Sequence, residues 1–429
     1  MAPNSMPEEL GKIFSVIDEN RDAMLQSLKE LVAIPSVSAD SAHRDDIVKA
    51  MHMVKKMMEA EGVRVDMQPL GDQTLSDGTT LPFPPLLLGS HGDDANKKTV
   101  CMYAHLDVQP AKMFMYEGME EVGSQGTVPY LRSDGKSKFF DGIDFVCISD
   151  NFWLGTEKPC LTYGLRGITY FDIEVVAGTR DFHSGQHGGI THEAMSDLMD
   201  LFDSLMDATG KIAVPGIYDD VRPVTDHERE LYRRIDFSLN EYRWEMGVSR
   251  LAHEDKVETL VHRWREPCLS LHGISGAYPD PGEPQLVPTH VHGKFSIRTV
   301  PDQQPDKVKE CVTKHLEQRF AQRNSPNRLK VTMTHSTSTW FTDPMTPHFK
   351  AAAAAVKHVH GVEPDLTCEG GTIGTVSALQ DHVCRNTLLM PINTAGSAAH
   401  AQNENTRLWN YINGAKQFAA YWYEVAKLH

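Results

Sequence analysis

The sequence places a histidine and an aspartate two residues apart, directly after an apolar, strand-like run. The run TVCMYA (99–104) is followed by His105, Leu106 and Asp107. On an extended strand, residues i and i+2 point to the same side, so one side chain can ligate a metal ion while the other holds the imidazole in the required tautomer. The carboxyl end of a parallel strand is where α/β folds place their sites. A structural role for the pair is the alternative.

Two adjacent carboxylates, Glu120 and Glu121, follow in the run EGMEEVGS (117–124). Neighbouring carboxylates repel each other, so placing both at the end of a strand requires a compensating cation. One of them can ligate a metal ion while the other acts as a general base on a water molecule. The alternative is a solvated acidic turn.

Three further residues stand in comparable places. Asp150 follows the apolar run IDFVCIS, His183 lies in the glycine-rich stretch RDFHSGQHGG, and His400 lies in AGSAAHAQNE before the last predicted helix. Each has a structural alternative, which for Asp150 is a helix cap or an Asx turn. Taken together, these positions offer imidazole and carboxylate ligands, a mixture that suits zinc or manganese.

The elements that must position these residues alternate between helix and strand at both ends of the chain. Apolar spacing predicts helices over 8–32, 45–60, 192–208, 225–237, 304–322, 346–359 and 406–427. Strand-like runs occupy 63–67, 99–104, 143–149, 168–176, 290–300, 329–335 and 387–391. A long irregular stretch is predicted between 237 and 290. The pattern favours one α/β domain interrupted by an inserted α+β domain.

Composition excludes several classes of protein. The 429 residues carry 42 basic and 58 acidic side chains, a net charge of −16, which argues against nucleic-acid binding and anionic membrane docking. The longest apolar run is too short to span a bilayer. The seven scattered cysteines and the lack of a secretory signal predict a cytoplasmic protein. A serine hydrolase and a zincin are disfavoured because neither G-x-S-x-G nor H-E-x-x-H occurs.

Motifs along nearly the whole chain resemble the M20 family of metallopeptidases, and within it the dipeptidases. The matching stretches are AHLDVQPA (104–111), EGMEEVGS (117–124), ISDNFW (148–153), KPCLTYGLRG (158–167), RDFHSGQHGG (180–189), VPGIYDDV (214–221), GKFSIRTVP (293–301) and AQNENTRLWNYI (401–412). The resemblance implies a metallopeptidase domain over 1–165 and 345–429, interrupted by a lid and dimerisation domain over 166–344. It also implies a homodimer that hydrolyses dipeptides such as Cys-Gly or carnosine-like peptides.

The same resemblance implies two divalent ions per subunit, zinc or manganese. By motif matching, His105 and Asp150 would hold one ion, while Glu121 and His400 would hold the other. Asp107 would orient the imidazole of His105, and Glu120 would take a proton from the attacking water.

The substrate site follows from the resemblance in the same way. His183 would reach across the dimer to stabilise the oxyanion. Arg298 would clamp the terminal carboxylate of the substrate, a task for which its planar fork is better suited than lysine. Gly371 and Thr372 would complete the site, and Gly371 stands where relatives carry a serine.

One departure from the family concerns the segment between the first two motifs. Relatives carry several dozen residues there, including a D-D-K-G motif whose first aspartate bridges the two metals, whereas here Pro110-Ala111 leads almost directly into KMFMYEGMEE. Parallel neighbours usually need a crossover of about a dozen residues or more. We therefore expect an antiparallel second strand, with its glutamates roughly 15–20 Å from His105.

From this departure we expect weak or absent dinuclear metal binding and impaired activity. The alternative function is a non-catalytic, dimerising homologue or isoform that binds peptides or its full-length relative.

Overall fold

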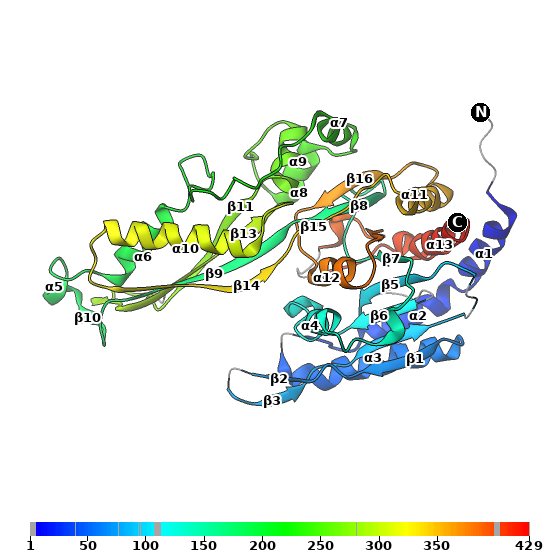
Figure 1. Cartoon of the computed structure of the whole chain (residues 1–429), viewed down its shortest axis with the longest axis horizontal. Helices are drawn as coiled ribbons and strands as arrows, with labels where there is room; N and C mark the ends of the chain where they lie inside the picture. Colours follow the sequence, from blue (N-terminus) through cyan, green and yellow to red (C-terminus); the bar gives the residue numbers. More distant parts are fainter. Residues whose placement is uncertain are drawn as a thin grey trace.

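The computed structural model describes residues 6–38, 40–75, 77–92, 94, 96–106, 113–279, 281–398 and 404–428. Figure 1 shows an elongated molecule with a large mixed sheet at one end and a long arm at the other. The α-helices are α1 (Glu8–Glu19), α2 (Arg21–Val32), α3 (Arg44–Ala60), α4 (Thr127–Arg132), α5 (Ser184–His187), α6 (Ala194–Asp203), α7 (Asp226–Arg234), α8 (Leu239–Met246), α9 (Lys256–Trp264), α10 (Pro305–Gln322), α11 (Pro347–His360), α12 (Gly374–His382) and α13 (Leu408–Val425).

The first strands are β1 (Arg64–Gln68), β2 (Asp72–Thr74), β3 (Thr80–Pro82), β4 (Leu86–Ser90), β5 (Val100–His105), β6 (Met113–Glu117), β7 (Phe145–Ile148), β8 (Cys160–Leu165) and β9 (Gly167–Val176). The remaining strands are β10 (Phe182–His183), β11 (Cys268–Ser275), β12 (Leu286–Val287), β13 (His290–Thr299), β14 (Arg328–Thr337), β15 (Trp340–Phe341), β16 (Asp365–Glu369) and β17 (Thr387–Leu389). Short 3-10 turns are η1 (Ser41–His43), η2 (Glu120–Val122), η3 (Lys138–Phe140) and η4 (Ala395–Ser397).

The large sheet runs in the order β1-β4-β6-β5-β7-β17-β8-β15, and β16 pairs with β8. The four strands β6, β5, β7 and β17 are parallel to one another. The pairs β1–β4, β4–β6, β17–β8 and β8–β15 are antiparallel. The strands β5 and β7 are buried along nearly their whole length, as expected where helices cover both faces of a sheet. One apolar core packs α1, α3, α11 and α13 against the sheet, and a second packs α4 and α12 against its other face.

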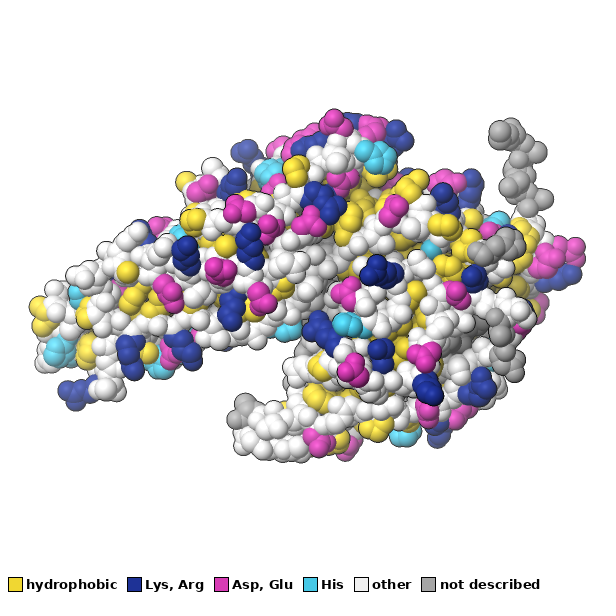
Figure 2. All heavy atoms as spheres, in the orientation of Figure 1, with side chains coloured by type: hydrophobic (Ala, Val, Ile, Leu, Met, Phe, Trp, Pro, Cys, Tyr) yellow, Lys and Arg dark blue, Asp and Glu magenta, His cyan; other side chains and the backbone are white. Residues whose placement is uncertain are grey.

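The lid sheet is a four-stranded antiparallel sheet in the order β11-β13-β9-β14. Burial alternates along β9, because Phe171, Ile173 and Val175 face a core formed with α6 and α10, while the residues between them are more exposed. The tip of the arm consists of β10, β12 and α5, which lie at the far end from the large sheet (Figure 1). Figure 2 shows an open notch between this arm and the β2–β3 end of the molecule, and mixed basic and acidic side chains over the visible face.

The α/β class and the inserted antiparallel unit agree with the sequence-based expectation. Two local predictions were wrong. The helix expected over 8–32 is broken at Asn20 into α1 and α2. The stretch expected to be irregular contains α8, α9, β11 and β12, because capping residues such as Ser238 and Asp255 start short helices that the apolar pattern alone does not reveal.

The predicted direction of β6 was also wrong, because β5 and β6 pair in parallel with His105 opposite Glu117. Residues 106–112 separate the two strands. An extended chain covers up to about 3.5 Å per residue, so these residues can span roughly 25 Å. The return along a five-residue strand needs only about 17 Å. A helix is therefore not required to connect parallel neighbours here, although the connection is shorter than usual.

Candidate active site

The site begins at the carboxyl edge of three neighbouring parallel strands. His105 ends β5, Glu117 ends β6 opposite it, and Asp150 follows β7 by two residues. The carboxyl ends of parallel neighbours meet at one edge of a sheet, which is where α/β folds bind ligands. The register of the ladder, rather than a long loop, thus brings the histidine and the aspartate together.

The turn after β6 brings the two glutamates back over this edge. Glu120 and Glu121 lie in η2, which ends at Gly123 with a left-handed φ of 86°. A side chain at Gly118 would place its Cβ 2.5 Å from Cγ2 of Ile47 in α3. Glycine at this position therefore lets the turn pack directly against α3, and that close approach sets the positions of Glu120 and Glu121.

The ligand atoms of His105, Glu120 and Glu121 all lie within 4.8 Å of one another. His105 Nε2 also forms a 2.7 Å hydrogen bond with Asp150 Oδ1. Two ligand atoms on one tetrahedral zinc ion stand about 3.3 Å apart, given bonds of about 2.0–2.1 Å. The arrangement is therefore close to what a shared cation needs, and the donor set of one imidazole and several carboxylates fits zinc or manganese.

The carboxylate of Glu120 shows the electrostatic cost of this crowding. Burial, together with the negative charge of Asp150, raises the pKa of Glu120 to about 8, although His105 acts in the opposite direction. A divalent cation placed among these carboxylates would offset their mutual repulsion. The same glutamate would then ionise at lower pH, which is the behaviour required of a general base.

Glu117 is a buried participant to which the sequence reasoning gave no function. Only 1% of its surface is exposed, and its Oε1 accepts hydrogen bonds from the hydroxyls of Tyr103 at 2.6 Å and Ser124 at 2.9 Å. Burial raises the pKa of Glu117. The sequence signal that could have revealed Glu117 is a carboxylate at the end of an otherwise apolar strand, because such a group is buried only when it has hydrogen-bond partners.

A cavity of about 440 Å³ opens beside these residues. Its lining includes the polar residues His105, Glu120 and Asp150 and also the apolar residues Leu28 and Leu31 of α2. The cavity lining is thus polar where the sheet ends and apolar where α2 contributes to it.

The other predicted residues are distributed over the molecule. Asp107 and His400 lie outside the described residues. His183 lies in β10 at the tip of the arm, where its Nδ1 accepts a hydrogen bond from the amide of Gly185. It does not line the described cavity, so the site within one chain does not contain it.

Arg298 and Thr372 meet at the junction of the lid sheet and the large sheet. Arg298 Nη1 donates to Thr372 Oγ1 at 2.8 Å, and that hydroxyl donates in turn to the carbonyl of Arg166 at 2.6 Å. The amide of Gly371 donates to Glu369 Oε1. The two predicted substrate residues are therefore brought together, but neither lines the cavity beside His105.

Comparison with known proteins adds an independent line of inference. Residues 163–324 match the peptidase dimerisation domain family, M20_dimer. The chain is 38% identical to the human Beta-Ala-His dipeptidase, covering 100% of this chain and 95% of that protein. It is 36% identical to the Cys-Gly metallodipeptidase dug1 of Schizosaccharomyces pombe, covering 99% and 100% of the two chains.

Solved structures agree with these similarities. The crystal structure of human carnosine dipeptidase 1 superposes with a TM-score of 0.89 at 38% identity, covering 99% of this chain and 100% of that one. The dipeptidase Dug1p of Saccharomyces cerevisiae superposes with a TM-score of 0.88 at 34% identity, covering 98% and 99%.

The alignment with the human Beta-Ala-His dipeptidase spans 482 positions, whereas this chain has 429 residues, so at least 53 positions have no counterpart here. The chain is nevertheless similar to its relatives from end to end, in sequence and in fold. From its full-length similarity, its dimerisation domain and its mixed sheet with an inserted antiparallel unit, the chain belongs to the M20 family of metallodipeptidases.

Proposed function

We propose that the chain is a dipeptidase for small substrates of the Cys-Gly or β-Ala-His type, with its active site at the carboxyl edge of β5, β6 and β7. The observation that carries this proposal is the gathering of His105, Asp150, Glu120 and Glu121 beside one cavity. The names of the curated relatives supply the substrate class.

The proposed roles follow from the donor types. His105 and Asp150 would hold one divalent ion, while Glu121 and His400 would hold a second; Asp107 would orient His105. Zinc or manganese ions held there would polarise the peptide carbonyl and acidify a water molecule. Glu120 would accept the proton of the attacking water and pass it to the leaving amine, a role that its position among His105 and Glu121 supports.

Substrate recognition would involve the lid. Arg298 would bind the terminal carboxylate of the dipeptide, with Gly371 and Thr372 beside it. His183 would come from a second copy of the chain, because its position at the tip leaves it outside the cavity of its own chain. The proposed assembly is a homodimer formed through the lid and dimerisation domain, residues 166–344. The metallopeptidase domain would comprise residues 1–165 and 345–429.

A cytoplasmic location is part of the same proposal. All seven cysteines are free thiols, most of them buried, as is usual in a reducing compartment. Within the described part of the chain, no helix has the length and apolar character needed to cross a membrane.

We also propose that metal binding and turnover are weaker than in the longer relatives. Only residues 106–112 connect β5 to β6, and at least 53 aligned positions of a relative have no counterpart in this chain. The bridging aspartate that the family resemblance calls for has no match in the sequence. Without it, two dications would repel each other with less screening between them.

The test combines elemental analysis with turnover. The full chain is loaded with Mn²⁺ or Zn²⁺, and hydrolysis of Cys-Gly and β-Ala-His is measured beside Glu120→Gln. A Glu317→Gln variant serves as the control, since Glu317 is exposed on α10. We expect fewer than two ions per chain at the candidate active site, counted as the ions that His105→Ala removes, and slow, metal-dependent turnover that Glu120→Gln lowers at least about a hundredfold. Two tightly bound ions with turnover equal to a full-length relative would contradict the impairment.

The second candidate is a non-catalytic homologue that dimerises and binds peptides or its full-length relative. The short β5–β6 connection favours it, because the lid remains complete while the metal site loses a segment. In this case the chain forms dimers in analytical ultracentrifugation and exchanges subunits with a full-length relative, but shows no metal-dependent hydrolysis of either dipeptide.

A further inference from the structure

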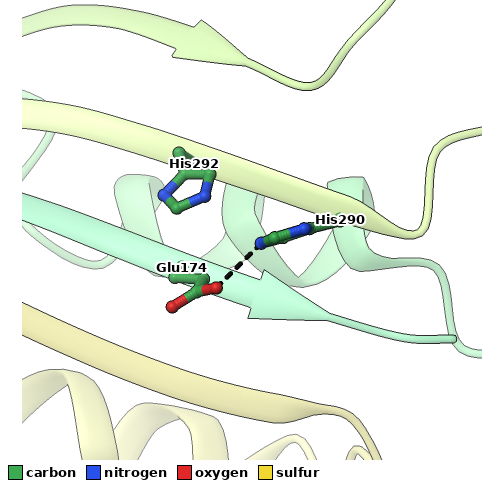
Figure 3. A group of neighbouring side chains, drawn as sticks. All are labelled: Glu174, His290 and His292. Atoms are coloured by element: carbon green, nitrogen blue, oxygen red, sulfur yellow. Dashed lines mark hydrogen bonds and ion pairs between the residues drawn. The ribbon is translucent and has the colours of Figure 1, made fainter. Parts of the chain in front are cut away.

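A second cluster of possible ligands lies on the lid sheet, outside the candidate active site. Glu174 of β9 and His290 and His292 of β13 have ligand atoms within 4.8 Å of one another. Figure 3 shows the three side chains together over the two strands, with a dashed line joining His290 to Glu174. Nothing in the proposed dipeptidase chemistry uses these residues.

The strand geometry explains why the three side chains meet. Residues two apart on a strand point to the same face, so His290 and His292 share one face of β13. Glu174 is the direct cross-strand partner of His292, and its neighbours Ile173 and Val175 face the core with α6 and α10. The cluster therefore lies on the opposite, open face of the lid sheet. Because the ladder fixes these positions, no loop has to close to form the cluster.

The hydrogen bonds already orient part of the cluster for a metal ion. His292 Nδ1 lies 2.8 Å from Asp172 Oδ1 on the same face of β9. A carboxylate on one ring nitrogen fixes the tautomer and leaves the other nitrogen as the ligand, which is the usual support for a metal-bound histidine. Asp172 thus provides His292 with the arrangement that natural zinc sites use.

The distance between the ligand atoms of His290 and Glu174 is only slightly shorter than a zinc site requires. His290 Nε2 and Glu174 Oε1 are 2.8 Å apart, compared with about 3.3 Å between two ligands of a tetrahedral zinc ion. The side chains of His290 and Glu174 are 54% and 25% exposed, so a small rotamer change can open the pair. A fourth position, facing solvent, remains for water.

The charges around the cluster set its selectivity. Lys330 of β14 is the cross-strand partner of Glu174 on its other side, and Lys294 stands opposite Asp172. These lysines weaken any purely electrostatic attraction for cations, so Mg²⁺ or Ca²⁺ is disfavoured. An ion that forms strong bonds to imidazole nitrogen, such as Zn²⁺, suits two histidines and one carboxylate.

We propose that Glu174, His290 and His292 form a Zn²⁺ site on the open face of the lid sheet, oriented by Asp172 and separate from the active site. The site lies at the base of the tip. β9 ends at Val176 and β13 begins at His290, and the chain beyond them is joined by hydrogen bonds from Ala177 to Thr289 and from Thr289 to Asp181. An ion joining β9 to β13 at this point stiffens the connection to β10 and β12.

The first experiment titrates the full-length protein with Co²⁺, a spectroscopic substitute for Zn²⁺, and then displaces it with Zn²⁺. The variants are Glu174→Gln and the double substitution H290A/H292A. His227→Ala is the matched control, because His227 is an exposed histidine of α7 outside the cluster. Circular dichroism and thermal midpoints verify that each variant is folded.

We expect the double variant to bind one Co²⁺ equivalent fewer than the parent and to lose the corresponding visible bands, with H227A unchanged. Glu174→Gln raises the Kd for that Co²⁺ equivalent at least tenfold. A folded double variant that binds as many Co²⁺ equivalents as the parent, with the same spectrum, overturns the proposal. The proposal is also overturned if substitution of His105 or Glu121 in the parent abolishes the binding of every Co²⁺ equivalent.

The second experiment follows amide hydrogen exchange with Zn²⁺ alone. In the parent, Zn²⁺ slows exchange over residues 174–183 and 286–292 at least several-fold, while H290A/H292A shows no such slowing. Equal slowing in parent and double variant overturns the assignment of the ion to these histidines. Neither experiment requires turnover, so both can succeed even if the chain proves inactive as a dipeptidase.

Discussion

The two histidine–carboxylate clusters of this chain have similar ligand spacing but very different surroundings. Around His105, three strand ends and a tight turn converge beside a cavity, and Glu120 is half-buried. Around His290, the ligands stand on the open face of two long, regularly paired strands. The first arrangement suits catalysis, because a substrate can enter and pKa values are shifted. The second suits ion binding without chemistry.

The two clusters also differ in what holds them in place. The lid cluster depends only on register within a ten-residue antiparallel ladder. The active-site cluster depends on η2, on Gly118 packing against α3, and on the short connection between β5 and β6. A change in chain length near β5 therefore affects the active site and leaves the lid site intact.

The largest effect that separates the clusters is expected from Glu120→Gln. Loss of the general base lowers kcat for dipeptide hydrolysis by about 10²–10⁴-fold, measured with saturating Mn²⁺. Zn²⁺ binding at the lid cluster stays unchanged in the same preparation. A loss of less than tenfold would show that another group removes the proton.

A smaller effect, on stability, is expected from Glu117→Ala. The substitution leaves the buried hydroxyls of Tyr103 and Ser124 without their acceptor, at a cost of about 1–3 kcal/mol for each. We expect the free energy of unfolding by urea to fall by about 3 kcal/mol. Glu363→Ala, which removes an exposed carboxylate paired with Lys357, is the control and changes it by less than about 0.5 kcal/mol.

A fall in pH tests the buried imidazole of His348, which contrasts with the more exposed imidazoles of the lid cluster. Burial lowers the pKa of His348 to about 3, while the unfolded chain titrates near 6.5. As pH falls below about 6.5, the unfolded state takes up a proton that the folded state does not, so stability falls. Between pH 7.5 and 5.5 this group contributes a loss of about 1.4 kcal/mol.

The measurement is the difference in pH dependence between the parent and His348→Gln, followed by urea unfolding. The variant lacks this contribution, so its stability falls less over the same range. Equal slopes for the two proteins would mean that His348 takes up its proton over the same pH range in the folded and the unfolded state. His227→Ala, at an exposed position, is expected to leave the slope unchanged.

The smallest effect is expected from His290→Ala on turnover. Because His290 lies on the lid sheet and not beside the active-site cavity, kcat/KM for dipeptides stays within about twofold of the parent when zinc is absent from the assay. A tenfold loss under these conditions would show that the two clusters are coupled without an ion.

The sequence allowed the fold class to be predicted, and motif matching named the residues of the candidate active-site cluster, because the relevant signals are local. The expectation that the glutamates lie roughly 15–20 Å from His105 was wrong, because β6 runs parallel to β5 and the ligand atoms lie within 4.8 Å of one another. The apolar run before His105 and the glutamate pair after β6 each reveal a strand end, and the structure brings His105, Asp150, Glu120 and Glu121 together. The assignment of individual roles to these residues stays a prediction.

The features that could not be predicted depend on pairing between distant segments. The parallel direction of β6 follows from its position between β4 and β5, which no single stretch encodes. The lid cluster requires the register that places His292 opposite Glu174, more than a hundred residues away in the chain. The sequence pattern predicted a strand over 290–300 but gave no means of finding its partner.

The apolar wall of the active-site cavity has a consequence for the order in which the molecule unfolds. α2 supplies Leu28 and Leu31 to that wall but contains no buried residue of its own, and Val32 at its end is 69% exposed. A helix held by so little burial opens at a small fraction of the global unfolding free energy. We therefore expect α2 to detach on warming while the large sheet is still folded, so that the cavity is lost before the protein unfolds globally.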